Sequence, residues 1–294
     1  MENNNKIHFI DKKVTDKMSI LDLNNNNIFT DYLSLIMNFS PYIDRIVFGK
    51  TMKTTDYHII YVERGNATIK FNMMEYELKQ GSLVFLNKNS IIITKRVSPD
   101  YNPLTVGFDT PAVVQKYEDL THHDTVFIQT SGKDSESVLN SFNLLYNFAK
   151  NSKRMDVGLE AMLVAILNIV NNLRDTEIYN ISTSIGSRNR IVKLFFYYLN
   201  IEEYPERNVQ SYADKIGISS DHLARTLKKE TCHSPLHWIN KRTIQMAQFL
   251  LCENPKMSLE DIALSLHCGS AANLIKLYKR ETGETPGMYR TRYA

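Results

Sequence analysis

A short basic segment near residue 225 carries side chains whose chemistry suits a polyanion. On a helix of 3.6 residues per turn, Leu223 and Leu227 share one face, while Arg225 and the pair Lys228 and Lys229 lie outside it. Guanidinium and ammonium groups attract phosphate, and arginine can also donate two parallel hydrogen bonds to guanine. The spacing therefore predicts an amphipathic helix whose outer face can contact DNA.

The residues before this segment predict a turn between two helices. Ala213 is small enough for two helices to cross closely, Gly217 can adopt the left-handed conformation, and Ser219 can cap the second helix. This is the pattern of a helix-turn-helix, whose second helix enters the major groove with its N-terminal half against base edges. Asp221 lies in that half, and we expect it either to accept from a cytosine amino group or to stabilise the helix N-terminus.

The same pattern occurs a second time further along the chain. Leu227–Pro235 recurs 51 positions later as Tyr278–Pro286, with a basic pair, Glu, Thr, a hydroxyl residue and Pro in matching places. Upstream of the second copy, Ile262–Cys268 and then Ser270 predict another turn and capped helix. Two such helices, joined by a long helix over about 235–251, can occupy successive major-groove segments roughly 34 Å apart.

These residues resemble the AraC-type family of bacterial transcription regulators over about Arg188 to Tyr293. The resemblance is carried by Ala263 with its apolar neighbours and by the closing motif Tyr278–Arg290. It implies base-reading positions in both units and, next to the first set, two lysines that contact phosphate or favour the helix dipole. The DNA-binding residues expected on this basis are Asp221, Ala224, Arg225, Lys228 and Lys229 in the first unit, and Ala271, Ala272, Asn273 and Lys276 in the second.

Three residues depart from the family pattern. His267-Cys268 stands where the family usually has Gly-Phe, and Cys232 stands where it has Gly. A residue with a side chain costs about 1 kcal/mol in the left-handed conformation, so we expect a remodelled turn before the second reading helix. That helix also offers Ala271 and Ala272, which can touch thymine methyl groups but donate no side-chain hydrogen bonds. We therefore expect the first unit to discriminate sequences more strongly.

The N-terminal region predicts an antiparallel β-barrel or sandwich. Short strand-like runs with turn signals extend from about 45 to 109, and one of them predicts a hairpin with the three-residue loop Asn72–Met74. Tyr61–Gly65 and Leu78–Val84 resemble the cupin-type sensor domain common in the family, which implies a possible sugar or metabolite effector inside the barrel. The sequence assigns no effector-binding residue. A barrel that is only structural, in a ligand-independent regulator, is the alternative.

Two helices are predicted after the barrel. Val138, Phe142, Leu145 and Ala149 recur at helical spacing, and the segment Val157–Leu173 is apolar on almost every side. Core packing and a homodimer interface both explain such a helix. The resemblance favours dimerisation through these helices and also allows contact with RNA polymerase.

The predicted fold class is α+β with two domains. Residues 1–175 form a cupin-like domain, with a barrel over about 30–130 and helices over about 134–175. Residues 176–187, where the apolar period is lost, form a linker. Residues 188–294 form an all-α domain of about seven helices, with the two units at about 208–230 and 258–282.

Composition and charge fit this division. The net charge is +3, but the residues from Ser187 onward hold 16 basic and 11 acidic residues, or +5, which leaves −2 for the rest. Three cysteines without metal-ligand spacing fit a reducing cytosol. The first residues lack a signal-peptide pattern, and the longest apolar stretch is too short to span a bilayer. We therefore expect a cytoplasmic protein.

A cupin-type enzyme with an accessory helical domain is the weaker rival. Such an enzyme usually presents two close histidines with a carboxylate and a later histidine, and His58 has no such partner nearby. The pair His122 and His123 lies in a polar segment that predicts a surface loop. We expect no catalytic residue, no metal and no cofactor, and double-stranded DNA as the main partner.

Overall fold

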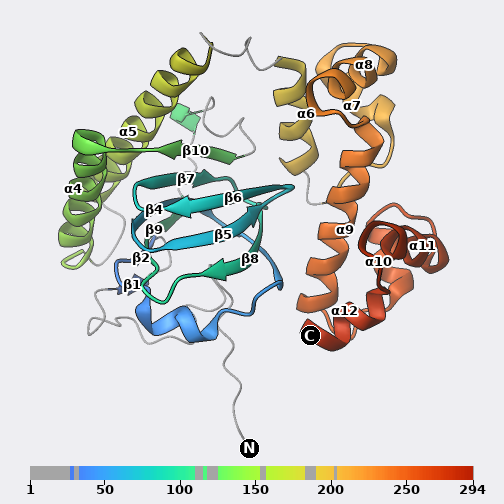
Figure 1. The fold of residues 1–294 in the computed structure, drawn as a ribbon, viewed down its shortest axis with the longest axis horizontal. Helices are drawn as coiled ribbons and strands as arrows, with labels where there is room; N and C mark the ends of the chain where they lie inside the picture. The colour runs from blue at the N-terminus through green and yellow to red at the C-terminus, as the bar shows by residue number, and fades with distance from the viewer. Residues whose placement is uncertain are drawn as a thin grey trace, which may run out of the picture.

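The computed structural model describes residues 27–29, 33–109, 115–117, 125–152, 157–182, 190–201 and 204–293. Figure 1 shows a β-rich N-terminal half on one side and a helical C-terminal half on the other, with the long helix α9 facing the sheets. The predicted α+β class with a helical second domain is confirmed.

The described strands form two antiparallel sheets. Six strands lie in the order β1-β2-β9-β4-β7-β10, and four lie in the order β3-β8-β5-β6. Two short 3-10 helices, Ser40–Arg45 and Gln115–Tyr117, connect parts of this region. The strands are β1 (Asn27–Phe29), β2 (Leu33–Ile36), β3 (Thr51–Lys53), β4 (Tyr57–Arg64), β5 (Asn66–Phe71), β6 (Met74–Lys79), β7 (Ser82–Leu86), β8 (Ile91–Val97), β9 (Asn102–Phe108) and β10 (Thr125–Gln129).

Strand alternation places two apolar layers against the six-stranded sheet. In β4, Ile60 and Val62 belong to the core between the two sheets, whereas Ile59 and Tyr61 belong to the core beneath the helices. Large apolar residues such as Phe71 fill the space between the sheets. The barrel interior is therefore a packed core over most of its length.

The hairpin loop is shorter than the sequence predicts. Phe71 pairs with Met74, so the loop holds two residues, Asn72 and Met73, and Met74 opens β6. Asn72 adopts a φ of 50°, a left-handed conformation that asparagine tolerates better than most residues. Asn89, in the turn between β7 and β8, has a φ of 63°. Both left-handed asparagines belong to turns that face the helical domain.

Two helices cover the outer face of the six-stranded sheet: α4 (Gly132–Ala149) and α5 (Val157–Ser182). The predicted inner face of α4 is confirmed, since Val138, Phe142, Leu145 and Ala149 are all buried. Because α5 continues to Ser182, the first part of the predicted linker 176–187 is helical. The later part, from 183, lies outside the described residues, as does the pair His122 and His123.

By length and composition alone, α5 is also the one helix in the described part of the chain that could cross a membrane. A third of its 18-residue window is buried in the molecule. Its inner face packs in the core with Phe142 and the sheet, as expected for a helix of a globular domain.

The helical domain contains, in its described residues, α6 (Arg190–Ile201), α7 (Val209–Ile216), α8 (Ser220–Thr231), α9 (Pro235–Glu253), α10 (Leu259–Ser265), α11 (Ala271–Thr282) and α12 (Pro286–Tyr293). The predicted caps Ser219 and Ser270 are confirmed, and five residues in all accept a hydrogen bond from the backbone N–H two or three residues on: Asn208, Ser219, Ser234, Ser258 and Ser270. Thr285 Oγ1 likewise accepts from Met288 N at 3.3 Å. The helix starts are thus fixed by local chemistry that the sequence makes visible.

The four-stranded sheet packs directly on α9. Arg242 of α9 is fully buried, and its terminal nitrogens donate to Asn89 O at 3.0 Å, Asn200 O at 3.3 Å and Asn72 Oδ1 at 3.4 Å. Gln245 donates to the backbone oxygen of Asn72. An arginine stays charged inside a protein, so these uncharged oxygens stabilise a cation that burial would otherwise penalise.

The sheet reaches the cores of both parts of the helical domain. Met73 packs with residues of α6, α7 and α8, and Ile91 and Ile93 pack with residues of α9, α10 and α11. Near the chain end, Tyr289 contacts Thr51 Oγ1 at 2.9 Å through its hydroxyl. Nothing in the local sequence pattern predicts this contact between the domains.

Candidate nucleic-acid interface

The first unit consists of α7, a tight turn and α8. Gly217 ends α7 with a φ of 80°, and its N–H donates to Asp214 O at 3.1 Å. The next N–H, of Ile218, donates to Ala213 O at 3.0 Å, which closes the turn. Ser219 then starts α8, with its Oγ accepting from His222 N at 3.2 Å. The predicted helix-turn-helix geometry is present.

The two faces of α8 are the predicted ones. Leu223 and Leu227 have no exposed surface and pack with Ile239 and Trp238 in the core of the first unit. The outward residues Asp221, Arg225, Lys228 and Lys229 are exposed, and Ala224 is half-buried. Their contact with DNA stays a prediction.

Arg225 is held loosely in the free protein. Its Nε donates to Asp221 O at 3.4 Å, a long bond within the same helix that does not engage its two terminal nitrogens. Those nitrogens are the pair that can bond guanine O6 and N7. Asp221 takes part in this contact through its backbone, so its carboxylate is not committed to Arg225.

The second unit repeats the turn with one residue more. His267 N donates to Leu264 O at 3.1 Å and Cys268 N donates to Ala263 O at 2.8 Å, matching the two bonds of the first turn. His267 itself takes the left-handed conformation, with a φ of 54°. Gly269, also left-handed, is then inserted before the cap Ser270. Compared with the first turn, the second therefore has one added residue and the same two hydrogen bonds, while its remodelling relative to the family stays a prediction.

Several polar groups around α11 are used by the fold itself. Ala271 N donates to Glu260 Oε2 of α10 at 2.8 Å, and Asn273 Nδ2 donates to Cys268 O at 3.1 Å. Ala272, Asn273 and Lys276 are exposed and Ala271 is half-buried, while Leu274 and Tyr278 have no exposed surface. Of the four predicted positions on α11, only Lys276 carries a polar side chain that no bond within the fold occupies.

The 51-residue repeat extends to side-chain hydrogen bonds. Thr231 Oγ1 donates to Leu227 O at 2.7 Å, and Thr282 Oγ1 donates to Tyr278 O at 2.8 Å. Both helices then end in a left-handed residue, Cys232 with a φ of 61° in the first copy and Gly283 with 81° in the second. The cysteine holds this conformation at a cost of about 1 kcal/mol that the glycine avoids.

Two histidines stack where the first unit meets α9. The rings of His233 and His237 lie 4.1 Å apart between centroids, and both contact Trp238. Burial, with Lys241 and His233 nearby, lowers the pKa of His237. The lowered pKa favours the neutral imidazole of His237, and the stacked rings add packing at the start of α9.

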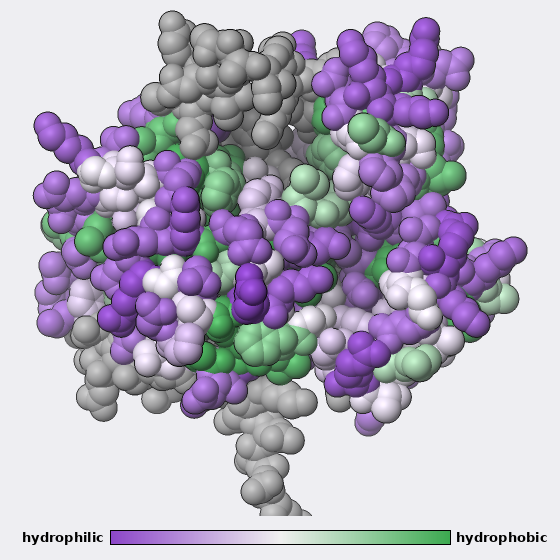
Figure 2. All heavy atoms as spheres, viewed as in Figure 1, coloured by the Kyte–Doolittle hydropathy of each residue, from purple (hydrophilic) through white to green (hydrophobic). Residues whose placement is uncertain are grey.

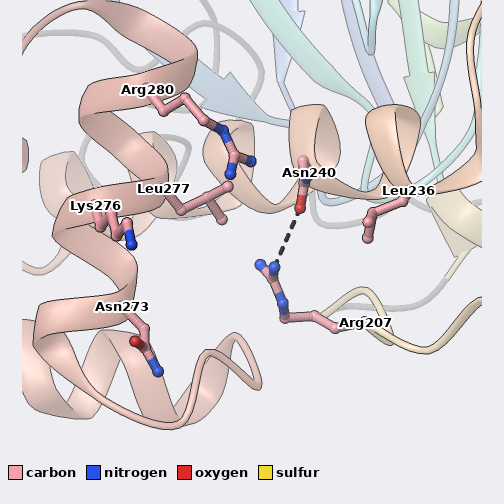
Figure 3. A pocket seen from close by; sticks show the side chains of 7 residues that line it. All are labelled: Arg207, Leu236, Asn240, Asn273, Lys276, Leu277 and Arg280. Atoms are coloured by element: carbon pink, nitrogen blue, oxygen red, sulfur yellow. Dashed lines mark hydrogen bonds between the residues drawn. The ribbon is translucent and has the colours of Figure 1, made fainter.

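A cleft between α11, α9 and the segment before α7 was not predicted from the sequence. It has a volume of about 290 Å³, and the side chains that Figure 3 draws converge on it. Two of its cations come from α11 and a third comes from the loop that precedes the first unit. The lining residues are Arg207, Leu236, Asn240, Asn273, Lys276, Leu277 and Arg280. The only signal in the sequence is the i, i+4 pair of cations on α11.

The visible surface of the helical domain is mostly hydrophilic (Figure 2). Among the described residues, no group of three or more His, Cys, Asp or Glu side chains could hold a metal ion. His58 is fully buried, and burial lowers its pKa to about 3, so its imidazole is neutral near pH 7.

Two matched helix-turn-helix units with exposed basic helices define a double helix-turn-helix DNA-binding protein. Residues 212–292 match the family model of a helix-turn-helix domain, and residues 42–166 match that of the AraC-like ligand binding domain. The chain therefore belongs to the AraC-type family of transcription regulators.

The individual proteins that this chain resembles share less than a quarter of their aligned residues with it. The Msm operon regulatory protein of Streptococcus mutans serotype c is 23% identical over 279 residues, which cover 92% of this chain and 94% of the relative. ToxT from Vibrio cholerae O395 has a TM-score of 0.43 at 12% identity, over 90% of this chain and 97% of that chain. The C-terminal domain of AraT, a response regulator from Geobacillus stearothermophilus, has a TM-score of 0.33 at 22% identity. The match covers 37% of this chain and 91% of that domain.

Proposed function

We propose that this regulator reads DNA mainly through Arg225 of α8, and that its barrel controls DNA binding by its contact with α9. The observation that carries the proposal is that α9 holds the two units together on one side and buries Arg242 against the four-stranded sheet on the other. Figure 1 shows α11 on the side of α9 away from the sheets and α8 beyond the upper end of α9, so the docked barrel leaves both recognition helices accessible. Family membership supports a cytoplasmic regulator without enzymatic activity.

Base reading is proposed to be unequal between the units. Arg225 has free terminal nitrogens on an exposed helix, whereas α11 presents two alanines and an asparagine amide that bonds Cys268. A bidentate arginine–guanine pair discriminates against the wrong base by roughly 1–3 kcal/mol, more than a methyl contact supplies. Lys228 and Lys229, exposed at the end of α8, are proposed to contact phosphate.

Arg225→Ala is expected to weaken binding to the cognate site by roughly 1–3 kcal/mol and to leave binding to random DNA nearly unchanged. The affinities for both DNAs are measured at one fixed salt concentration, because phosphate contacts depend on salt. Lys228→Ala is the matched control and should weaken binding to both DNAs alike. An equal loss on both DNAs for Arg225→Ala would make this residue a phosphate contact instead.

The barrel is proposed to act on the reading domain through two asparagine turns. Arg242 donates one hydrogen bond to the side-chain oxygen of Asn72 and another to the backbone oxygen of Asn89. Removing the Asn89 side chain therefore leaves its contact with Arg242 intact. Glycine at either position also keeps the left-handed backbone.

Asn72→Gly is expected to lower the stability of the helical domain by about 1–3 kcal/mol, although residue 72 lies in the barrel, because buried Arg242 and the Ile91 N–H lose the acceptor that they share. The readout is the unfolding midpoint followed by Trp238, the single tryptophan of the chain, which packs against α6 and α8. Asn89→Gly serves as control and should leave this midpoint in place. Identical midpoints for both variants and the unchanged protein would refute the coupling.

A small-molecule effector is proposed to bind beside His58, on the inner face of β4. Neither ring nitrogen of His58 has a hydrogen-bond partner in the protein, and the same holds for Thr105 Oγ1 on the adjacent strand β9. Gly107 packs against the His58 ring, where a Cβ would come within 2.6 Å of Cε1. A neutral imidazole can donate one hydrogen bond and accept one, which suits a hydroxylated ligand such as a sugar.

The second candidate is a ligand-independent regulator, and the packed core between the sheets favours it. A panel of sugars and metabolites distinguishes the two by thermal unfolding: a ligand at one hundred times its Kd should stabilise the protein by about 2.7 kcal/mol. His58→Leu is expected to abolish that stabilisation. A panel without any stabilising compound would favour the structural barrel.

Homodimerisation is proposed to use the outer face of α4 and the start of α5. Leu144 and Phe148 are four residues apart on α4 and remain 46% and 44% exposed, and Val157 of α5 is 84% exposed. Large side chains of this kind on one face indicate a protein interface. Contact with RNA polymerase stays a prediction from the family.

Leu144→Asp with Phe148→Asp is expected to convert the dimer to monomer, measured by sedimentation equilibrium, because two charges would be buried in an apolar contact. Met288→Asp, at a 58% exposed apolar side chain on α12, is the control and should leave the mass unchanged. A dimer that persists in the double variant would place the interface elsewhere.

A further inference from the structure

The cleft beside α11 lies at the junction of the two units. Asn273, Lys276, Leu277 and Arg280 line it from α11 of the second unit, while Leu236 and Asn240 line it from the first turns of α9. Arg207 completes it immediately before Asn208, the residue that caps α7 of the first unit. The cleft therefore draws its walls from the second unit, from the residue just before the first unit and from the helix that connects the two units (Figure 3).

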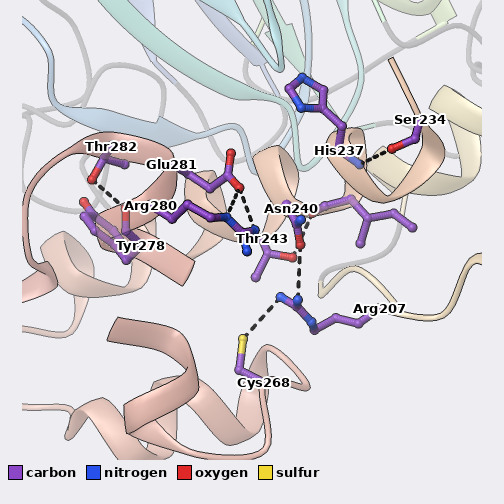
Figure 4. Close-up of polar contacts among 11 residues, drawn as sticks. Arg207, Ser234, His237, Asn240, Thr243, Cys268, Tyr278, Arg280, Glu281 and Thr282 are labelled. Carbon is purple, nitrogen blue, oxygen red and sulfur yellow. Dashed lines mark hydrogen bonds and ion pairs between the residues drawn. The ribbon is translucent and has the colours of Figure 1, made fainter. Parts of the chain in front are cut away.

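The cleft is cationic, and one of its cations is fixed in place. Arg207 donates to Asn240 Oδ1 at 3.1 Å and contacts Cys268 Sγ at 3.5 Å, so two elements orient its guanidinium (Figure 4). The lining holds three cations and no carboxylate. Such a concentration of like charge in a recess attracts an anion.

The other two cations, Arg280 and Lys276, are exposed and can contact an anion from solution. Arg280 bonds Glu281 Oε1 at 2.7 and 3.0 Å on its own helix, where the arginine side chain is 59% exposed. An exposed pair of this kind contributes little stability, so a phosphate can replace the carboxylate. Lys276 is exposed at the rim, one turn before Arg280. The polar chemistry of the cleft fits a phosphate group with its several acceptor oxygens.

We propose that this cleft binds a backbone phosphate of the DNA where the duplex passes between the two recognition helices. The inference rests on the proposed function, since a duplex that places successive major-groove segments on α8 and α11 must bring its backbone past the junction between them. A contact of this kind carries no sequence information and fixes the register of the protein on the duplex. A free phosphate ion offers the same chemistry and is the competing source.

The test measures DNA binding by the variants Arg207→Gln and Arg280→Gln. The control is Arg96→Gln, which removes the same charge from an exposed arginine of the barrel. Each cleft variant is expected to weaken binding to cognate and random DNA equally, by roughly fivefold to tenfold near 0.1 M salt, and to reduce the salt slope by about one. Arg96→Gln should change neither quantity. Arg207→Lys, which keeps the charge, should retain most of the slope and exclude misfolding as the cause.

Three results would overturn the proposal. A loss confined to the cognate site would make the cleft a base-reading element, and unchanged salt slopes would remove it from the DNA contact. Calorimetric binding of inorganic phosphate to the DNA-free protein, abolished in Arg207→Gln while the salt slopes stay unchanged, would assign the cleft to a free anion. The Arg225→Ala comparison is run in parallel: if it loses discrimination while the cleft variants do nothing, only the cleft inference fails.

Discussion

The burial of Arg242 between α9 and the four-stranded sheet constrains the arrangement of the whole molecule. Its charge cannot be removed, and its acceptors are the backbone oxygens of Asn89 and Asn200 and the side chain of Asn72. Those acceptors come from two turns of the barrel and from the end of α6. Separation of the domains would require water to replace the two barrel acceptors. The guanidinium thus favours the one arrangement of the two domains in which all three acceptors reach it.

The same helix, α9, supports both units of the helical domain. One side of α9 belongs to the cores beneath α8 and α11, which fixes both recognition helices to a common support. Although the two units share their turns, caps and threonine bonds, α11 uses the Asn273 amide and the Ala271 N–H to hold its own turn. The polar chemistry left on α11 is cationic and lies toward the cleft. Repetition of the fold has therefore not produced repetition of the surface.

Local features of this fold could be predicted from the sequence because local chemistry determines them. Ser219 and Ser270 cap helices through bonds to residues three positions away, and the faces of α4 and α8 follow from apolar spacing. The two-residue loop at Asn72 was missed by one residue, since asparagine accepts a backbone conformation that the pattern alone does not fix. The end of α5 was missed because its last turns lack apolar periodicity.

Contacts between distant segments could not be predicted in this way. Arg242 and Asn72 are 170 positions apart, and an arginine in mid-helix is more often a solvated residue than a buried link between domains. Arg207 and Arg280 come together only because both units pack against the connecting helix α9. In both cases, the sequence contains the side chains without any signal of their proximity.

The four-stranded sheet contributes Met73 to the core of the first unit and Ile91 and Ile93 to that of the second. The same β-structure thereby packs against the cores of both helix-turn-helix units. The separation of α8 and α11 is consequently supported by the barrel as well as by α9. On the proposed function, a change of operator spacing during evolution would then require a compensating change in the β-rich domain as well.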